Sequence, residues 1–409
     1  MRSLTPLTLL LSAAMNAQTT VTVTTAPANA DQVWYSLQNG TVRTAPLVEW
    51  DLGFEIAGFT ASILVNTAKG IAVFKAPYAV GAWNSLDTAG MTNSWTQVYD
   101  SDTSWSYGAL NQELTSDEFD LGWGVYNLVT HTVAGDSLFV VHLANGDWKK
   151  LRIDGLAANT YTFTWADLDG SNETTGSLNK ANYADKNFGY FSLENNMALD
   201  REPLTTDWDL LFTKYTAFIP QAYPVAGVLQ NRNVTCLRVA GMDPALAEWT
   251  GGYYDPHINT IGYDWKSFNM QTFQYDIATD RCYFVKDGSD QVWKLIFTDY
   301  GGSATGDITF TQELISAAGI DEAGAPAASI AVYPDPVEGG TTNLFIDAPG
   351  THADLRVLDA SGRVMIARPL DGALAMRTLP LDVQTLSPGA YIAQVQGGGY
   401  RVHSRFIVR

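Results

Sequence analysis

The sequence contains very little cysteine, with only Cys236 and Cys282 among 409 residues. This low count excludes a fold held together by several disulfides, and no CxxC or other zinc-type spacing is present. One disulfide between the two stays open, because an exported chain meets an oxidising environment. Positive charge is also scarce: 24 Lys and Arg stand against 43 Asp and Glu, which gives a net charge of −19. This imbalance argues against nucleic acid or anionic lipid as a partner.

Long apolar runs are missing as well. After the N-terminus no stretch approaches 18 uninterrupted apolar residues, so no membrane span is predicted in the mature chain. The N-terminus itself reads MRSLTPLTLLLSAAMNAQ, with one positive residue, a short apolar run and then small residues. This pattern predicts a secretory signal peptide over residues 1–17, with cleavage after Ala17.

Helical periodicity is nearly absent, and short alternating or apolar runs take its place. Examples are TVTVTT, SLFVVHL, YTFTW and WKLIFT, which are separated by turn pairs such as NG, DG and GG. Alternation with a period of two between turn signals is typical of β-hairpins. The sequence therefore predicts an all-β protein.

The sequence is rich in one feature, an ordered series of repeated phrases. WYSLQNG at position 34 and VEWDLGF at position 48 recur as YFSLENN at 190 and TDWDLLF at 206. Three further pairs follow in the same order: WSYGALN with WKSFNMQ, LFVVHLANGDWKKLRI with YFVKDGSDQVWKLIF, and YTFT with ITFT. An ordered series indicates duplication. We predict two related β-rich modules, 30–180 and 187–316, then a linker, 317–328, and a separate C-terminal domain, 329–409.

The phrase Trp-Asp-Leu-x-Phe predicts a core strand. On a straight strand Trp208, Leu210 and Phe212 share one face, while Asp209 and Leu211 share the other. The first face is apolar and is expected in the core. Asp209 is then expected to accept hydrogen bonds from backbone or from an indole N–H, because a buried carboxylate must be satisfied.

The last 80 residues combine a stiff extended entry, short apolar strands and turns, the pattern of an immunoglobulin-like β-sandwich. They resemble the type A C-terminal sorting domain of the Bacteroidetes type IX secretion system. The matching residues are Tyr333, Pro334, Pro336, Asp359, Gly362, Arg363, Leu386, Gly389 and Tyr391, with Asp335 where the family usually has Asn. The resemblance implies export by the Sec and type IX systems. It also implies contact of 329–409 with the secretion machinery and its sortase, and a secreted or outer-membrane cell-surface product.

The body of the chain resembles the HmuY family of secreted haem-binding proteins, an all-β family. The second module carries the better match, in Trp208, Asp209, Phe212, Tyr215, Gly288, Trp293, Lys294, Phe297, Thr298, Tyr300, Gly306 and Phe310. The first module keeps Trp50, Asp51, Phe54, Gly146, Trp148, Leu151, Ile153 and Phe163. The resemblance implies a non-enzymatic binding protein for haem or another hydrophobic ligand.

Haem iron needs axial ligands, usually His or Met, and the family member that defines the site uses two His from loops. His257 in YYDPHIN, Met242 in GMDP and Met270 after WKSFN are the loop candidates here. His131 in LVTHTV and His142 in SLFVVHL are predicted to lie on sheet faces.

Other chemistry has little support in the sequence. HExxH, GxSxG, Walker A and GxGxxG are all absent, so no enzyme activity is predicted. The loop DLDGSNE clusters Asp167, Asp169 and Glu173, oxygen ligands that suit Ca²⁺, although the loop does not follow the EF-hand template. The abundant Trp and Tyr leave a carbohydrate-binding or surface-attachment protein as the alternative to a haem binder.

Overall fold

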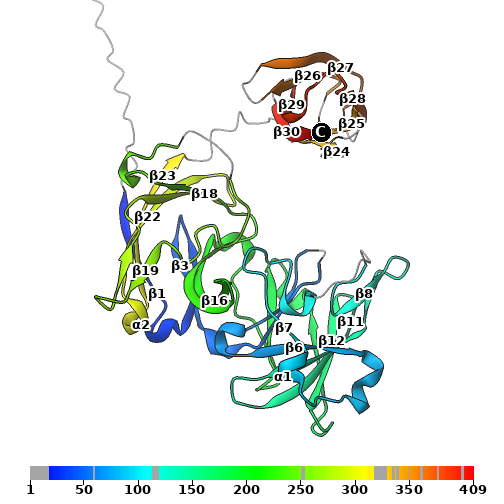
Figure 1. Ribbon diagram of the computed structural model, residues 1–409, viewed down its shortest axis with the longest axis vertical. Coiled ribbons are helices and arrows are strands. Elements are labelled where there is room, and N and C mark those ends of the chain that lie inside the picture. Colours follow the sequence, from blue (N-terminus) through cyan, green and yellow to red (C-terminus); the bar gives the residue numbers. More distant parts are fainter. Residues whose placement is uncertain are drawn as a thin grey trace, which may run out of the picture. The chain divides into compact units, whose positions relative to one another are not determined.

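The computed structural model confirms the all-β fold and divides the chain into two compact units, 1–318 and 319–409 (Figure 1). It describes residues 18–58, 60–112, 119–249, 254–316, 329–333, 337, 340–348, 350–359, 363–374, 377–397 and 400–409. The predicted signal peptide, 1–17, and the predicted linker, 317–328, lie outside the described residues. No helix in the described part of the chain is both long and apolar enough to cross a membrane.

The first unit contains two β-sandwiches, which we call the first and second lobes. The first lobe spans 50–199, with an inner sheet ordered β15-β14-β4-β5 and an outer sheet ordered β13-β12-β11-β10-β6-β7. Strands β8 and β9 attach beside β11. Its elements are β4 Leu52–Glu55, β5 Ile63–Val65, β6 Ala72–Ala79, α1 Met91–Ser94, β7 Thr96–Val98, β8 Gly124–Asn127, β9 Thr132–Gly135, β10 Ser137–His142, β11 Trp148–Ala157, β12 Thr160–Asp167, β13 Thr174–Asn179, β14 Phe188–Ser192 and β15 Met197–Leu199.

The second lobe combines 19–46 with 205–316. Its inner sheet has the order β17-β16-β2-β3 and its outer sheet the order β1-β23-β22-β21-β18, with the hairpin β19–β20 beside them. Its elements are β1 Thr19–Thr24, β2 Asp31–Ser36, β3 Gly40–Pro46, β16 Leu210–Phe218, β17 Ala222–Gln230, β18 Thr235–Ala240, β19 Lys266–Asn269, β20 Gln274–Ile277, β21 Arg281–Lys286, β22 Val292–Tyr300, α2 Gly302–Thr305 and β23 Asp307–Ser316.

The inner sheets of the two lobes correspond strand by strand, but each takes its first two strands from the other repeat. Strand β14 pairs with β4 of the first WDLxF phrase, through Phe191 and Leu52. Strand β2 pairs with β16 of the second phrase, through Tyr35 and Leu210. The predicted boundaries, 30–180 and 187–316, follow the repeat in the sequence, whereas the sheets group 50–199 in one lobe and 19–46 with 205–316 in the other. The N-terminal strands therefore close the second lobe.

Both faces of each WDLxF strand are buried. Leu210 and Phe212 pack into the core of the second lobe, whereas Trp208 packs with Leu211 and Trp34 on the opposite side. The prediction that Trp208 shares a face with Leu210 and Phe212 is therefore wrong. The reason is local: β16 begins only at Leu210, so the strand alternation does not extend back to Trp208.

The hairpins of the two outer sheets also correct the sequence alignment. His142 pairs with Trp148, and Lys286 pairs with Val292, so Trp148 corresponds to Val292 and not to Trp293. The pair WSYGALN and WKSFNMQ is not supported either. Trp105 donates its Nε1 hydrogen to Gln230 O of the other lobe at 2.8 Å, whereas Trp265 is buried in a core and stacks on Phe297.

The cysteines are free thiols buried on adjacent strands. Strand β18 pairs with β21 so that Cys236 lies opposite Val285 and Cys282 lies opposite Val239. Cys236 packs into the core of the second lobe, while Cys282 packs on the other side of the sheet with Phe284. The two thiols therefore face opposite sides of one sheet.

The second unit is a sandwich of two antiparallel sheets, ordered β24-β25-β28 and β27-β26-β29-β30. Its strands are β24 Ser329–Tyr333, β25 Thr341–Asp347, β26 His352–Asp359, β27 Val364–Asp371, β28 Arg377–Asp382, β29 Gly389–Gly397 and β30 Tyr400–Val408. Asp359 N donates to Arg363 O, and Arg363 N donates to the side-chain oxygen Asp359 Oδ1, both at 3.0 Å. Tyr391 Oη donates to Ser387 O at 2.8 Å. Pro334, Asp335, Pro336 and Gly362 lie outside the described residues.

A buried carboxylate in the first unit makes its stability depend on pH. Glu202 is 1% exposed and accepts hydrogen bonds from Asn187 N at 2.9 Å and from Tyr190 Oη at 2.8 Å. Burial raises the pKa of Glu202 from 4.5 to about 7. Between these two values the folded state binds more protons than the unfolded state, so stability falls as the pH rises through this window.

Glu202 is expected to lower the free energy of unfolding of the wild type by about 3 kcal/mol as the pH rises from 4.5 to 8. We expect this decrease to be absent in Glu202→Gln. Glutamine keeps an oxygen for Asn187 N, and the Tyr190 hydroxyl can accept from the new amide. Urea unfolding at both pH values measures the effect. Equal slopes of stability against pH in the variant and the wild type would contradict this assignment.

Candidate functional site

The Asp of the repeated phrase occupies the same position in both lobes and holds a hairpin turn. Asp51 Oδ2 accepts from Leu193 N at 2.6 Å, and Asp209 Oδ2 accepts from Leu37 N at 2.7 Å. In each lobe the turn belongs to the hairpin contributed by the other repeat. This confirms the expectation that Asp209 accepts a hydrogen bond from the backbone, and it gives both aspartates a structural role.

A second equivalent pair of residues holds the backbone next to this Asp and was not found from the sequence. Asn66 donates from Nδ2 to Trp50 O at 3.0 Å, and Asn231 donates from Nδ2 to Trp208 O at 2.7 Å. Asn66 directly follows β5 and Asn231 directly follows β17, the edge strands that pair with the two WDLxF strands. The available signal was an Asn directly after an apolar strand in each repeat, SILVN and GVLQN.

The lobes differ next to this Asp. In the first lobe Lys69 donates from Nζ to Asp51 Oδ1 at 2.7 Å and to Glu194 Oε2 at 3.1 Å. The second lobe has Val234 in the position of Lys69, since Lys69 N bonds Asn66 O and Val234 N bonds Asn231 O. Burial, followed by the charge of Asp287, raises the pKa of Asp209 to about 6.

A polar pocket of about 430 Å³ opens beside Asp209 in the second lobe. Amide, hydroxyl and carboxylate side chains dominate its wall. The lining residues are Ser36, Gln38, Asn39, Thr205, Thr206, Trp208, Asp209, Asn231, Asn233, Val234, Asp287, Gly288, Ser289 and Gln291.

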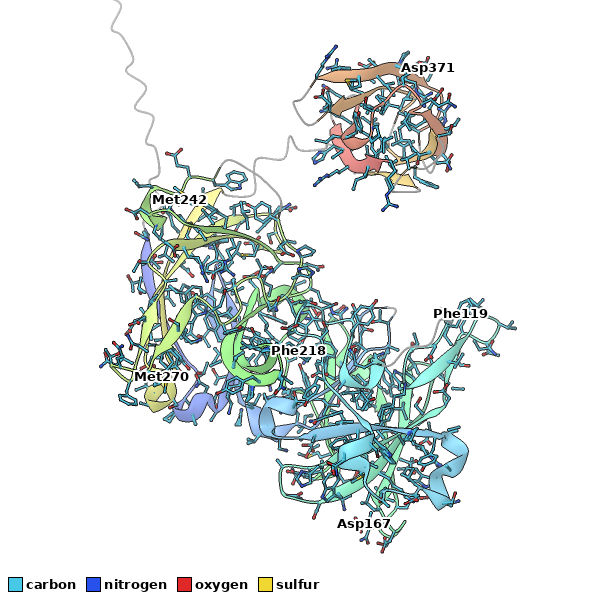
Figure 2. The ribbon with its side chains drawn as sticks, viewed as in Figure 1. Phe119, Asp167, Phe218, Met242, Met270 and Asp371 are labelled. Atoms are coloured by element: carbon cyan, nitrogen blue, oxygen red, sulfur yellow. The ribbon has the colours of Figure 1, made fainter. Side chains whose placement is uncertain are left out.

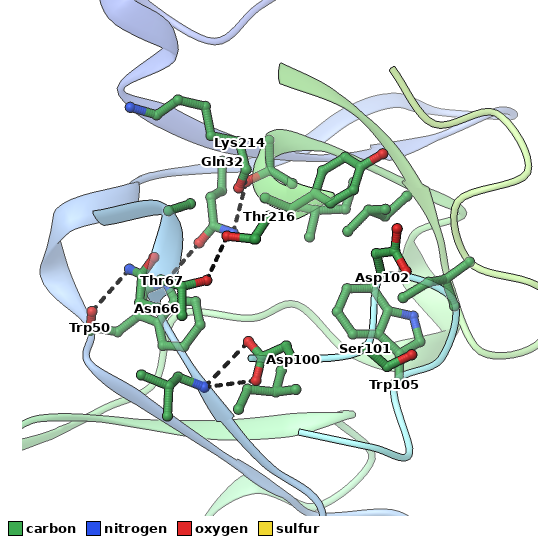
Figure 3. Close-up of a pocket in the computed structure, with 18 of the residues that line it drawn as sticks. Gln32, Trp50, Asn66, Thr67, Asp100, Ser101, Asp102, Trp105, Lys214 and Thr216 are labelled. Atoms are coloured by element: carbon green, nitrogen blue, oxygen red, sulfur yellow. Dashed lines mark hydrogen bonds between the residues drawn. The ribbon is translucent and has the colours of Figure 1, made fainter. Parts of the chain in front are cut away.

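A small cavity of about 70 Å³ lies between the lobes (Figure 3). Asp100 lies at its wall and accepts from Ala109 N at 2.7 Å, and burial raises the pKa of Asp100 to about 7. Across the cavity Thr67 and Thr216 join the lobes through a hydroxyl hydrogen bond of 2.7 Å. Drug-sized ligands occupy about 300–1,000 Å³, so this cavity has room for water and not for such a ligand.

A larger apolar pocket of about 350 Å³ lies in the first lobe, around His131. His131 adopts a positive φ of 54° in the turn between β8 and β9, and its Nδ1 lies 2.7 Å from Tyr126 Oη. The predicted sheet-face position of His131 is therefore wrong. The reason is that Asn127 Oδ1 accepts from Val129 N and Thr130 N, which closes a turn inside the β-like run. The remaining lining is Gly58, Ala61, Phe119, Leu121, Val133, Leu156 and Lys180.

The predicted haem ligands are not brought together. His257 is exposed and its Nδ1 lies 2.9 Å from Asp255 Oδ1. Met242 and Met270 are exposed too, and Figure 2 shows them at separate ends of the second lobe. His142 lies at the end of β10 and stacks on Trp148, with ring centroids 4.4 Å apart.

The three calcium candidates bond protein donors. Asp167 pairs with Lys149 Nζ at 2.5 Å, Asp169 accepts from Ser171 N at 2.8 Å, and Glu173 accepts from Trp83 Nε1 at 2.7 Å. Within the described ranges no group of three or more His, Cys, Asp or Glu side chains is placed to hold a metal ion. Calcium binding at this loop stays a prediction.

The solved structures that match this chain do so too weakly to carry an argument about its fold or function. PorZ, a surface component of the type IX secretion system of Porphyromonas gingivalis, is 10% identical with a TM-score of 0.16, over 73% of this chain and 46% of that chain. Latent PorU from Porphyromonas gingivalis is 10% identical with a TM-score of 0.17, over 95% and 34%. A BSP domain of a biofilm-associated protein is 11% identical with a TM-score of 0.17, over 97% and 67%. The chain spans about half the length of the first structures it matches.

Sequence families identify the C-terminal domain. No curated protein matches the chain. Residues 331–409, in contrast, match the family described as the secretion system C-terminal sorting domain. This match confirms the type IX sorting domain predicted from the residues, and a sorting domain implies interaction with the type IX machinery. The chain therefore ends in a type IX sorting domain and is a secreted or cell-surface protein exported by that system.

Proposed function

We propose that the protein is a non-enzymatic cell-surface binding protein for a small hydrophobic ligand, held in the pocket around His131. The pocket volume of about 350 Å³ carries the proposal, because it falls within the range of small-molecule sites. Its wall is mostly apolar, with the Tyr126 hydroxyl, the His131 imidazole and the Lys180 ammonium as polar groups. Burial lowers the pKa of Lys180, which indicates that this ammonium is partly desolvated.

Haem is the ligand that the resemblance implies, but the lining fits it poorly. His131 can offer Nε2 to an iron, because Tyr126 engages Nδ1. No second His or Met is among the described residues that line the pocket. The described lining therefore does not offer two His ligands, as the family member that defines the site does.

Leu156→Trp tests the pocket by filling it. The probe is 1-anilinonaphthalene-8-sulfonate, whose rings suit the apolar wall and whose sulfonate can pair with Lys180. We expect enhanced fluorescence with the wild type and at least a tenfold loss of affinity in the variant. Val129→Trp is the control, because Val129 is 88% exposed in the turn between β8 and β9, the turn that also carries His131.

Unchanged binding in Leu156→Trp would overturn the proposed site. Haemin is the second probe: a red-shifted Soret band that disappears in His131→Ala would make haem the ligand. A carbohydrate-binding function is the alternative, favoured by the exposed aromatic side chains of the β19–β20 hairpin, Phe268, Phe273 and Tyr275. Binding on a glycan array that is lost in Phe273→Ala would support it.

A further inference from the structure

The two lobes differ in how they compensate the charge of the Asp in the repeated phrase. The first lobe buries the Asp of the repeated phrase completely, and the Lys69 ammonium neutralises it. Glu194 completes that site by accepting from the same ammonium. In the second lobe Val234 replaces Lys69, and Gln38 occupies the position of Glu194, one residue after the turn N–H that bonds the Asp. The same carboxylate is thus present without its internal cation.

The second-lobe pocket carries negative charge with no cation in its wall. None of the described residues that line it is Lys, Arg or His. Asp287 adds a second carboxylate, whose oxygens accept from Ser289 N, Gln291 N and Trp293 Nε1 at 2.8–2.9 Å. These bonds fix Asp287 in place, and its charge contributes to the raised pKa of Asp209. The field in this pocket favours a positively charged ligand group.

The rest of the wall selects for a polar ligand. Gln38, Asn39, Asn233, Ser289 and Gln291 offer amide and hydroxyl groups that can both donate and accept hydrogen bonds. Trp208 lines the same pocket, and its buried indole Nε1 has no acceptor within the described part of the chain. Such a wall matches a ligand that carries hydroxyl groups beside its charge.

We propose that the pocket of the second lobe binds an amino sugar, whose ammonium group occupies the place that the Lys69 ammonium fills in the first lobe. Asp209 is the carboxylate that receives this ammonium, and the surrounding amides bond the hydroxyl groups. This site is separate from the apolar pocket around His131, so either proposal can fail without the other.

The test uses glucosamine as the probe, with saturation-transfer NMR on the full chain at pH 7.5. We expect glucosamine to bind in the millimolar range and Asp209→Asn to weaken it at least tenfold, since a hydrogen bond to a charged group is worth about that factor or more. N-acetylglucosamine lacks the charge, so we expect it to bind the wild type at least tenfold more weakly than glucosamine does. Asp299→Asn is the matched control. Asp299 is exposed on β22, so this substitution removes one negative charge outside the pocket.

Val234→Lys provides an independent variant. Its ammonium is expected to pair with Asp209 as Lys69 does with Asp51, and so to displace glucosamine while the far-ultraviolet circular dichroism spectrum stays unchanged. Val234 is buried, so this variant can fail to fold. In that case glucosamine binding by Asp209→Asn tests the proposal. Equal binding of glucosamine to Asp209→Asn and the wild type would overturn the proposal, and so would equal binding of glucosamine and N-acetylglucosamine. Stronger binding of Nα-acetyl-lysine amide than of glucosamine would overturn the assignment to a sugar.

Discussion

Replacing Lys69 by methionine is expected to lower the free energy of unfolding of the first unit by about 3 kcal/mol or more. Lys69 is the only cation bonded to Asp51 within the described residues, and Asp51 is 0% exposed. Removal of one partner of a buried ion pair leaves an uncompensated charge, which costs about 3–5 kcal/mol. Backbone donors such as Leu193 N remain and keep the loss near the lower end of this range.

Urea unfolding followed by tryptophan fluorescence measures this loss. Lys149→Met is the matched control: the Lys149–Asp167 pair lies nearer the surface, so its loss is expected to cost less than about 1 kcal/mol. The double variant Lys69→Met/Asp51→Asn should recover part of the stability, because it removes the orphaned charge and keeps an acceptor for Leu193 N. Equal effects of Lys69→Met and Lys149→Met would contradict the buried pair.

The sequence alone predicts the β class, the repeat and the C-terminal domain, because each has a local signature. Alternation and turn pairs reveal strands, and the motif from Asp359 to Tyr391 reveals the sorting domain. The repeated WDLxF phrase correctly marks strands in the interior. Its Trp is misplaced because the start of a strand depends on the 3-10 turn before it, Thr205–Asp207, and not on alternation.

The exchange of hairpins could not be predicted, because pairing partners are set by contacts far apart in the sequence. Strand β2 lies closer along the chain to β4 than to β16, and either WDLxF strand offers it an equivalent edge. The candidate pockets were missed for a similar reason. The residues around His131 alternate as in a strand, and the Asx turn that interrupts them is seen only in the structure. The replacement of Lys69 by Val234 is recognised only after the two lobes are aligned on Asn66 and Asn231.

Deletion of 18–46 is expected to unfold the second lobe and leave the first lobe folded. This segment, which contains β1 and β2, supplies Val23, Val33, Tyr35 and Leu37 to the core of the second lobe. Burial of each apolar side chain contributes about 1.5–3 kcal/mol. The loss of all four is therefore comparable with the whole free energy of unfolding of a typical domain, about 5–15 kcal/mol. The deletion also exposes the edges of β16 and β23 to unwanted pairing. Limited proteolysis and mass spectrometry should show cleavage within 205–316 and protection of 50–199.

A circular permutation separates strand exchange from a general need for the N-terminus. We expect 47–204 to fold as a separate fragment and 205–316 to remain unfolded. Fusion of 18–46 after residue 316 through a short Gly/Ser linker should restore folding, because β1 runs antiparallel to β23 with Thr19 opposite Gln312. The new connection therefore joins ends that already lie close together. Cooperative thermal unfolding of 205–316 alone would show that the exchanged strands are dispensable. Folding only of the permuted fragment would show that the second lobe is completed by the strands that precede the first lobe in the chain.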